Sequence, residues 1–140
     1  MMERFTVSTD KSKMDVPMIH EYLSEQSYWA KGRSVALVEK SIENSLCFGV
    51  FDENNDQIAF ARVATDFVVF AWLMDVFVQE SHKGKGIGKL LLEAIVDHPD
   101  LKQVNGLGLR TDDAHNFYKQ FGFDSVPSPE TWMFKKKKSK

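Results

Sequence analysis

Cysteine is almost absent from this chain of 140 residues, and so are long hydrophobic runs. A single cysteine, Cys47, permits no internal disulfide, which is typical of proteins in a reducing compartment. Its apolar neighbours favour a small core residue over a nucleophile. The longest apolar run, 67–78, contains Asp75 and is too short to cross a bilayer. The first residues lack the basic start and apolar core of a signal peptide, so we expect a cytoplasmic protein with no membrane partner.

The chain also lacks a large excess of charge of one sign. The net charge is −2, and the five lysines of the tail at 135–140 leave the rest of the chain acidic. A nucleic-acid partner is therefore not expected, because such proteins carry a basic surface. The length and a hydrophobic fraction of 43% indicate one globular domain over residues 1–140, with a basic tail that can fray.

Three glycines follow an apolar segment in the stretch from Leu73 to Leu92. Gly84, Gly86 and Gly88 lie between a predicted strand and a helix with an apolar face. Glycine lets the backbone approach an anion closely. The first amides of a helix have no partner inside it, and the helix dipole favours negative charge there. The pattern therefore predicts a pyrophosphate site.

The spacing of these glycines excludes two common phosphate-binding motifs. The dinucleotide motif Gly-x-Gly-x-x-Gly would end on Lys89 or Leu91, and the P-loop motif would need glycine at Lys89. The segment Lys83-Gly-Lys-Gly-Ile-Gly88 instead resembles the Gln/Arg-x-x-Gly-x-Gly/Ala signature of the GCN5-related N-acetyltransferase superfamily. That resemblance implies that the loop binds the pyrophosphate of acetyl-coenzyme A and that the preceding strand pairs with the pantetheine arm. The cofactor-binding residues implied here are Val76, Phe77, Val78, Lys83, Gly84, Lys85, Gly86, Ile87, Gly88 and Lys89.

A second segment, 111–123, resembles the family signature Asn-x-x-Ala-x-x-Phe/Leu-Tyr-x-Lys/Arg-x-Gly-Phe. The matching residues are Ala114, Phe117, Tyr118, Gly122 and Phe123. The resemblance implies that Phe117 contacts the cofactor and that Tyr118 protonates the leaving thiolate, which a phenol with a pKa of about 10 can do at neutral pH. The chain departs from the two signatures at Lys83, Glu80 and Thr111, which replace the usual Gln or Arg, Pro and Asn.

The order of predicted elements fits the α/β fold of this family. That fold is a mixed, mostly antiparallel sheet of six to seven strands, splayed between strands 4 and 5, with helices on both faces. Asp15 and Ser34 are predicted helix caps. The predicted strands are Phe5–Ser8, Ser45–Phe51, Ile58–Val63, Phe67–Val78, Val104–Arg110 and Thr131–Lys136, and the predicted helices are Val16–Leu23, a second one after Ser34, Gly86–Asp97 and Ala114–Phe121.

The resemblance implies direct attack of an amine on the thioester, with a backbone amide near residues 76–78 receiving the carbonyl oxygen. No general base is carried over, because the position of one family glutamate corresponds to Trp72. Asp75 lies on the opposite face by strand alternation, although a bulge could re-aim it. Asp66, His20 and Glu21 are further candidates, and each is more commonly a structural or surface group.

The acceptor site of the family is usually built from the first two helices, their connection and the central strands. Aromatic faces near a carboxylate suit a cationic amine, and arginines suit a substrate that also carries a carboxylate or phosphate. The candidate residues are Tyr28, Trp29, Arg33, Arg62, Asp66, Trp72 and Asp75. For Trp29 and Trp72, a place in the core is an equal alternative.

A small-molecule amine is therefore the expected partner, acetylated by acetyl-coenzyme A without a metal ion. Two alternatives stay open: a peptide or protein N-acetyltransferase, and an acyl-coenzyme A sensor without turnover. Relatives commonly form homodimers, but no apolar stripe in the sequence demands one.

Overall fold

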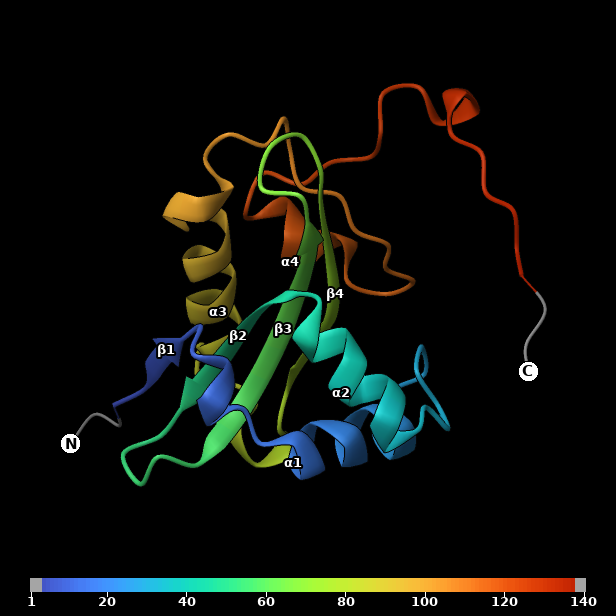
Figure 1. Ribbon diagram of the computed structural model, residues 1–140. Helices are drawn as coiled ribbons and strands as arrows, with labels where there is room; N and C mark the ends of the chain where they lie inside the picture. The colour runs from blue at the N-terminus through green and yellow to red at the C-terminus, as the bar shows by residue number, and fades with distance from the viewer. Residues whose placement is uncertain (1–3, 138–140) are drawn as a thin grey trace. The chain divides into compact units, whose positions relative to one another are not determined.

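The computed structural model describes residues 4–137 and divides into two compact units, Met1–Arg110 and Thr111–Lys140. The first unit contains a four-stranded antiparallel sheet in the order β1-β2-β3-β4 (Figure 1). Its elements are β1 (Thr6–Ser8), α1 (Val16–Glu21), α2 (Val35–Glu43), β2 (Leu46–Phe51), β3 (Gln57–Thr65), β4 (Ala71–Val78) and α3 (Ile87–Val96). The second unit contains α4 (His115–Lys119).

Side-chain caps begin the first two helices where the sequence predicts them. The Asp15 carboxylate accepts a hydrogen bond from the Met18 amide at 3.1 Å, and the Ser34 hydroxyl accepts one from the Leu37 amide at 3.2 Å. Each cap satisfies an amide that the helix itself leaves unbonded. The chain continues from α1 through one π-helical turn at Tyr22–Gln26, a geometry that sequence periodicity does not predict.

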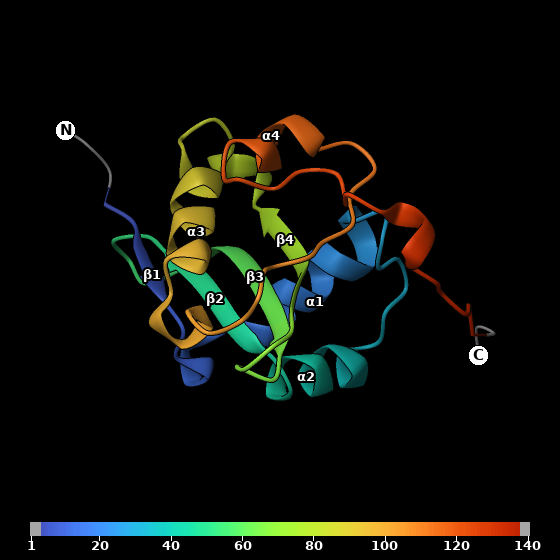
Figure 2. The same ribbon diagram turned by 90° about the horizontal axis from the view of Figure 1, so that it is seen from above.

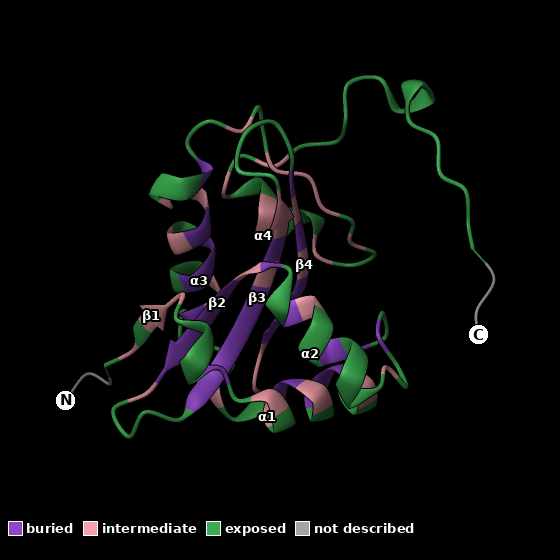
Figure 3. Ribbon diagram, in the orientation of Figure 1, coloured by how far each residue is buried: buried purple, intermediate pink, exposed green. Residues whose placement is uncertain are grey.

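The sheet is covered on both faces, as expected. Figure 2 shows α3 on one side of the strands and α1 and α2 on the other. Side chains of α1, α2 and the sheet form one apolar cluster that includes Ile19, Val38 and Phe60. On α3, Leu91, Leu92 and Ile95 are completely buried. Figure 3 shows β2 and β3 buried along most of their length, so these strands form the rigid centre that supports the loops at the strand ends.

The predicted strand over 67–78 is four residues too long. β4 begins at Ala71, and the four apolar residues before it form an exposed loop. The Asp66 carboxylate accepts hydrogen bonds of 2.9 Å from the amides of residues 68, 69 and 70. Phe67 has a positive φ of 64°. A local cap thus overrides the strand preference of the apolar run.

The predicted strand over 104–110 is reduced to one parallel bridge between Gly108 and Trp72. The Gly108 amide donates to the Ala71 carbonyl at 3.0 Å, and the Leu73 amide donates to the Gly108 carbonyl at 2.8 Å. A Cβ at Gly108 would lie 2.6 Å from the Trp72 ring, so only glycine permits this approach. Beyond the bridge, β4 has no strand neighbour on this side within the described residues, which leaves the expected opening of the sheet.

The predicted strand over 131–136 is also wrong. In the second unit a 3-10 turn occupies Pro129–Thr131, and the chain from there to residue 137 is not part of a strand. The sheet therefore has four strands among the described residues, in place of the expected six to seven. The end of the basic tail, 138–140, lies outside the described residues.

Candidate functional site

The glycine loop before α3 presents unbonded backbone amides in a row. Gly84 and Gly86 have φ values of +83° and +78°, a conformation that side-chain-bearing residues rarely adopt. The first helical hydrogen bond runs from the Leu90 amide to the Gly86 carbonyl at 3.1 Å. Within the described chain, no acceptor is recorded for the amides of 86–89, and Gly86 provides no side-chain cap. These amides and the helix dipole provide the donor set that a pyrophosphate requires.

The lysines around the loop differ in their contacts. Lys83 Nζ lies 2.9 Å from Glu80 Oε1, and this hydrogen bond raises the pKa of Lys83. Both side chains are at least half exposed, so the pair contributes less than about 1 kcal/mol and can exchange for another anion. Lys89 is exposed within the first turn of α3, where a positive charge opposes the helix dipole.

A bulge interrupts the pairing of β4 with β3 just before this loop. Arg62 pairs with Met74 and Phe60 pairs with Phe77, so that Ala61 of β3 stands opposite two residues of β4, Asp75 and Val76. A bulge leaves the extra residue without its ladder partner and turns side chains in a new direction. Asp75 has a φ of +55°, which aspartate tolerates better than most residues do.

The backbone of β4 at 76–78 therefore lies at an open sheet edge and next to the bulge. The side chains of Val76 and Val78 are half-buried, whereas Phe77 is buried and stacks on Tyr22 with a centroid distance of 4.0 Å. Phe77 contributes packing to this region, and its predicted contact with the cofactor would come from the main chain. Strand edges of this kind accept extended ligands through backbone hydrogen bonds.

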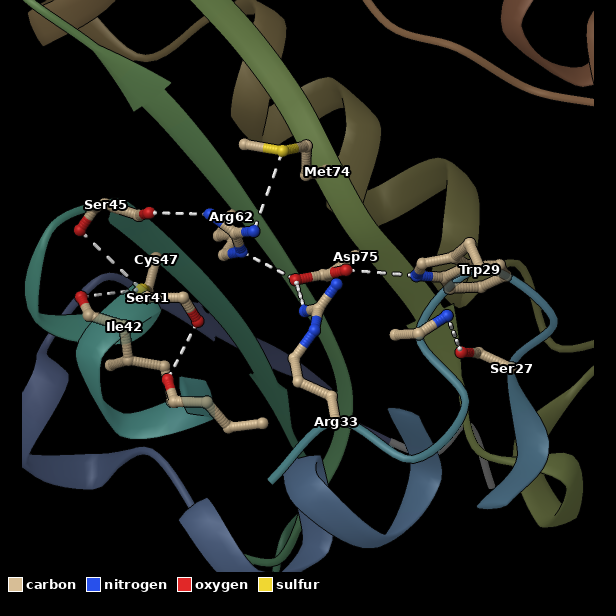
Figure 4. Close-up of polar contacts among 12 residues, drawn as sticks. Ser27, Trp29, Arg33, Ser41, Ile42, Ser45, Cys47, Arg62, Met74 and Asp75 are labelled. Carbon is tan, nitrogen blue, oxygen red and sulfur yellow. Dashed lines mark hydrogen bonds and ion pairs between the residues drawn. The ribbon is translucent and has the colours of Figure 1, made fainter. Parts of the chain in front are cut away.

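Asp75 collects three donors from different parts of the first unit (Figure 4). Its Oδ2 accepts hydrogen bonds from Arg33 Nη1 at 2.7 Å and from Arg62 Nε at 2.6 Å. Its Oδ1 accepts one from Trp29 Nε1 at 3.0 Å. Four of the predicted acceptor-site residues are thus brought together around the Asp75 carboxylate. The bulge turns this side chain toward the two arginines, the possibility that strand alternation alone did not give.

The electrostatics of Asp75 make it a weak base at neutral pH. Burial alone would raise the pKa of Asp75, but the charges and hydrogen bonds of Arg62 and Arg33 outweigh burial and lower it. Both carboxylate oxygens are already occupied by donors. Asp75 consequently holds the arginines and the Trp29 loop in place, and it is poorly suited to act as a general base.

The remaining acceptor candidates have different surroundings. Tyr28 and Trp29 are 52% and 41% exposed and contact each other edge to face at 5.0 Å, so neither is a core residue. Trp72 is half-buried and stacks on Phe70 with a ring-centroid distance of 6.3 Å. Its ring also covers Gly108, so Trp72 serves close packing. Asp66 caps the 67–70 loop, and the amides of Phe70, Val68 and Val69 lower its pKa. The contacts of Asp66 are those of a structural group, and none of them joins it to the Asp75 cluster.

Two groups near the cluster were not predicted as site residues. Ser45 accepts a hydrogen bond from Arg62 Nη1 at 3.1 Å, and the π-helical turn positions Tyr22 on Phe77. A lone serine before a strand and a one-turn change of helical period carry no sequence signal that would mark them. Cys47 is buried, and burial raises the pKa of its thiol to about 11, which agrees with its predicted core role.

The second unit contains the two residues of the second signature that were assigned to the site. Tyr118 and Phe117 are half-buried on α4, with a ring-centroid distance of 5.2 Å between them. Gly122, at a φ of +90°, ends this helix, and the Phe123 amide donates to the Tyr118 carbonyl at 3.3 Å. The predicted helix and its glycine stop are therefore confirmed.

No cluster of three or more His, Cys, Asp or Glu side chains suited to a metal ion occurs among residues 4–137. Over the same residues, none of the helices has the length and apolar character needed to cross a membrane.

Comparison with known proteins gives the same family as the two signatures. Residues 43–125 match the model of the acetyltransferase (GNAT) domain. A crystal structure of a GNAT-family protein from Xanthomonas campestris pv. campestris is 43% identical, covers 97% of this chain and 95% of its own, and superimposes with a TM-score of 0.93.

Two curated relatives agree with this match. An acetyltransferase-family protein of Gibberella zeae is 29% identical over 84% of this chain and 78% of its own length. An uncharacterized N-acetyltransferase of Gracilaria tenuistipitata var. liui is 31% identical over 81% of this chain and 65% of its own length. The chain belongs to the GNAT family of acetyltransferases.

Proposed function

We propose that this protein transfers the acetyl group of acetyl-coenzyme A to a primary amine of a small molecule, with both substrates bound together. The observation that carries the proposal is the row of unbonded amides at 86–89, placed directly after the open edge of β4. Family membership supports the reaction class, and the loop supports the choice of a cofactor that contains a pyrophosphate.

The residues of the loop fit coenzyme A by the chemistry of their donors. The amides of Gly86, Ile87, Gly88 and Lys89 would hold the pyrophosphate, and the ammonium groups of Lys83, Lys85 and Lys89 would attract it from solution. The glycines at 84 and 86 keep side chains away from this surface, since a Cβ on either would point into open space that a ligand can fill.

The bulge in β4 supports the placement of the thioester carbonyl. The bulge disrupts the pairing of β4 with β3 at Asp75 and Val76, and we propose that a main-chain amide there donates to the carbonyl oxygen as negative charge develops. We assign the oxyanion donor to the backbone of 76–78.

The two proton transfers would involve different groups. Asp75 already accepts three hydrogen bonds, and Asp66, in the loop before β4, accepts those of its own loop. We therefore assign the proton of the amine to water rather than to either carboxylate. The turnover should then rise with pH up to the pKa of the amine. For the leaving thiolate we retain Tyr118 as the proton donor, a role that rests on the second signature.

An acyl-coenzyme A sensor is the second candidate, and the saturation of Asp75 favours it. Calorimetry with acetyl-coenzyme A and thiol release across amines and peptides would separate the two. Because Cys47 is buried, with a thiol pKa of about 11, it should add little background to a thiol-reactive dye. Binding without thiol release on any acceptor would support the sensor, and release on peptides alone would support the protein acetyltransferase.

Charge reversal at Lys89 tests the cofactor site itself. Glutamate in the first turn of α3 should raise the free energy of unfolding by about 0.3–1 kcal/mol, because it complements the helix dipole. The same change should weaken acetyl-coenzyme A binding roughly five- to thirtyfold at low salt, and less at high salt, because it opposes the phosphates. Calorimetry and denaturant unfolding of the same Lys89→Glu sample measure both effects.

Lys102→Glu is the matched control, since Lys102 is an equally exposed lysine that follows the 3-10 turn at Pro99–Leu101. It makes the same change in net charge and should leave cofactor affinity within about twofold. Equal losses in both variants would mean that only overall charge matters, and the loop would then not be the anion site.

A further inference from the structure

The cluster around Asp75 contains more positive than negative charge. Two guanidinium groups contact one carboxylate, which leaves one positive charge uncompensated in a largely buried setting. The Asp75 side chain is 2% exposed, and those of Arg62 and Arg33 are 12% and 23% exposed. Removal of a charge from water is costly unless another charge compensates it. The cluster is therefore suited to receive one more anion.

The two arginines use their donors differently. Arg62 donates to Asp75 through Nε, to Ser45 through Nη1 and to the Met74 sulfur through Nη2, so each of its three guanidinium nitrogens has an acceptor. Arg33 bonds Asp75 through Nη1 alone, and among residues 4–137 no acceptor is recorded for its Nε or Nη2. Arg33 is also the more exposed of the two. Its unused N–H groups match the planar geometry of a carboxylate or a phosphate.

The surroundings of Arg33 connect this anion site to the reaction. Asp75 immediately precedes Val76, at whose backbone we place the thioester carbonyl. Trp29 shares the Asp75 carboxylate with Arg33, and its ring is exposed next to that of Tyr28. An aromatic surface beside a guanidinium suits a molecule with an amine at one end and an anionic oxygen group at the other.

We propose that Arg33 binds an anionic oxygen group of the acceptor, so that the substrate is an amine that also carries a carboxylate or a phosphate. This inference rests on the proposed acetyl transfer and narrows its acceptor. Asp75 orients Arg33 as a positioning residue, and Arg62 of β3 stabilises Asp75. Monoamines and diamines without an acidic group would lack the anion that compensates Arg33.

A purely structural role of the cluster makes a different prediction. If Arg33 only ties its loop to β4, substitution would lower the activity on all amines by one common factor. If Arg33 binds the anion, substitution would lower the activity on anionic amines alone. A ratio of activities on matched substrates separates the two cases, because differences in intrinsic amine reactivity cancel between enzyme variants.

The test compares kcat/KM for β-alanine, aminoethyl phosphate and n-propylamine, which lacks an anionic group, with acetyl-coenzyme A at saturation and thiol release as the readout. In the wild-type protein at least one anionic amine should be preferred over n-propylamine. In Arg33→Gln that preference should fall about ten- to a hundredfold, as expected for the loss of a charge-assisted pair. The ratio of the two anionic amines identifies which group the site prefers.

Two further variants keep the test decisive. Lys31→Gln removes an exposed cation two residues away and should leave the preference unchanged, which controls for general attraction of anions. Arg33→Lys retains the ion pair with Asp75, and so the fold, but loses the planar fork. It should show an intermediate preference even if Arg33→Gln does not fold.

An unchanged preference in both Arg33 variants would overturn the inference, and so would a wild-type protein that favours n-propylamine. In either case acetyl transfer to an amine would stand. A wild-type protein that binds acetyl-coenzyme A but releases no thiol with any acceptor would instead remove the proposed function.

Discussion

Asp75 combines an unusual backbone conformation with a fully used side chain. Its positive φ costs of order 1–3 kcal/mol for a residue other than glycine, although aspartate is among the least affected. The charge-assisted hydrogen bonds from Arg33 and Arg62 hold the carboxylate in this position. The side-chain contacts therefore fix the bulge, and the bulge fixes the adjacent backbone of Val76.

We predict that Asp75→Asn is destabilising by up to about 3 kcal/mol, because it leaves two half-buried guanidinium groups without their counter-charge. Asparagine tolerates a positive φ, so the effect reports charge rather than backbone strain. Because folding lowers the pKa of Asp75, its stabilising contribution is complete above the ordinary value near 4 and is lost as the pH falls through the folded value. Denaturant unfolding between about pH 3 and pH 7 should show that the free energy of unfolding falls less steeply with acid in the variant than in the wild type.

Asp66→Asn is the appropriate comparison for that experiment. Its carboxylate also has a lowered pKa, but it lies fully in solvent, and an asparagine oxygen can accept the same loop hydrogen bonds. The dependence of the free energy of unfolding on acid should change less than in Asp75→Asn. An Asp75→Asn protein as stable as the wild type at pH 7 would show that the ion pairs do not hold the bulge.

Among the elements, the glycine loop with α3 matches its sequence prediction most closely. The predicted helix over 86–97 is observed as Ile87–Val96, with Gly86 and Asp97 as its flanking residues. Gly84 and Gly86 both adopt the left-handed conformation, for which a resident glycine is the physical signal.

We expect Gly86→Ala to lower the free energy of unfolding by about 1–2 kcal/mol, since alanine is strained at a φ of +78°. Acetyl-coenzyme A binding should be weakened further, because the new methyl group occupies space where the pyrophosphate would lie. Gly32→Ala is the matched control, with a φ of +75° and equally open surroundings. It should show a similar loss of stability with unchanged cofactor affinity, measured by calorimetry and thermal unfolding. Equal affinities in the two variants would contradict a phosphate site at Gly86.

The elements that the sequence predicts correctly are those specified by local interactions. Asp15 and Ser34 cap their helices through contacts three residues away, and Gly122 ends α4 through its own conformation. The wrong predictions depend on interactions that no short pattern contains. Residues 67–70 have the apolar composition of a strand, but Asp66 accepts hydrogen bonds from the amides of 68, 69 and 70 and holds them in a loop. The segment 104–110 makes one bridge to β4, where the Trp72 ring covers Gly108.

The candidate site was predictable to a similar extent. The two signatures lead to the proposed cofactor loop and to Tyr118 as the proposed acid, and the structure confirms the backbone features of these segments, namely the left-handed glycines and the helices beside them. The ion pairs of Asp75 with Arg33 and Arg62 span 42 and 13 residues of sequence, and the bulge that joins them breaks the alternation on which the prediction relied. Only the register of β3 against β4 reveals this cluster.

At the scale of the whole molecule, acyl transfer would draw on segments distributed over most of the chain. The acceptor residues begin at Tyr28, the cofactor loop ends at Lys89, and the proposed acid is Tyr118 in the second unit. The matched family domain, 43–125, includes the boundary between the units at Arg110. The family match therefore includes residues of both units.

We predict that Tyr118→Phe lowers kcat by about ten- to a thousandfold, because general acid catalysis by a positioned group typically contributes a factor of about 10²–10⁴. The affinity for acetyl-coenzyme A should change less than about threefold, since the ring and its contacts with Phe117 and Phe123 are retained. Phe121→Leu, which alters the packing against Phe117 just after α4 without removing a hydroxyl, controls for a general disturbance of α4. The decisive measurement is single-turnover thiol release with a matched calorimetric titration. An undiminished kcat in Tyr118→Phe would mean that water, and not Tyr118, protonates the thiolate. The second signature would then describe only the packing of α4.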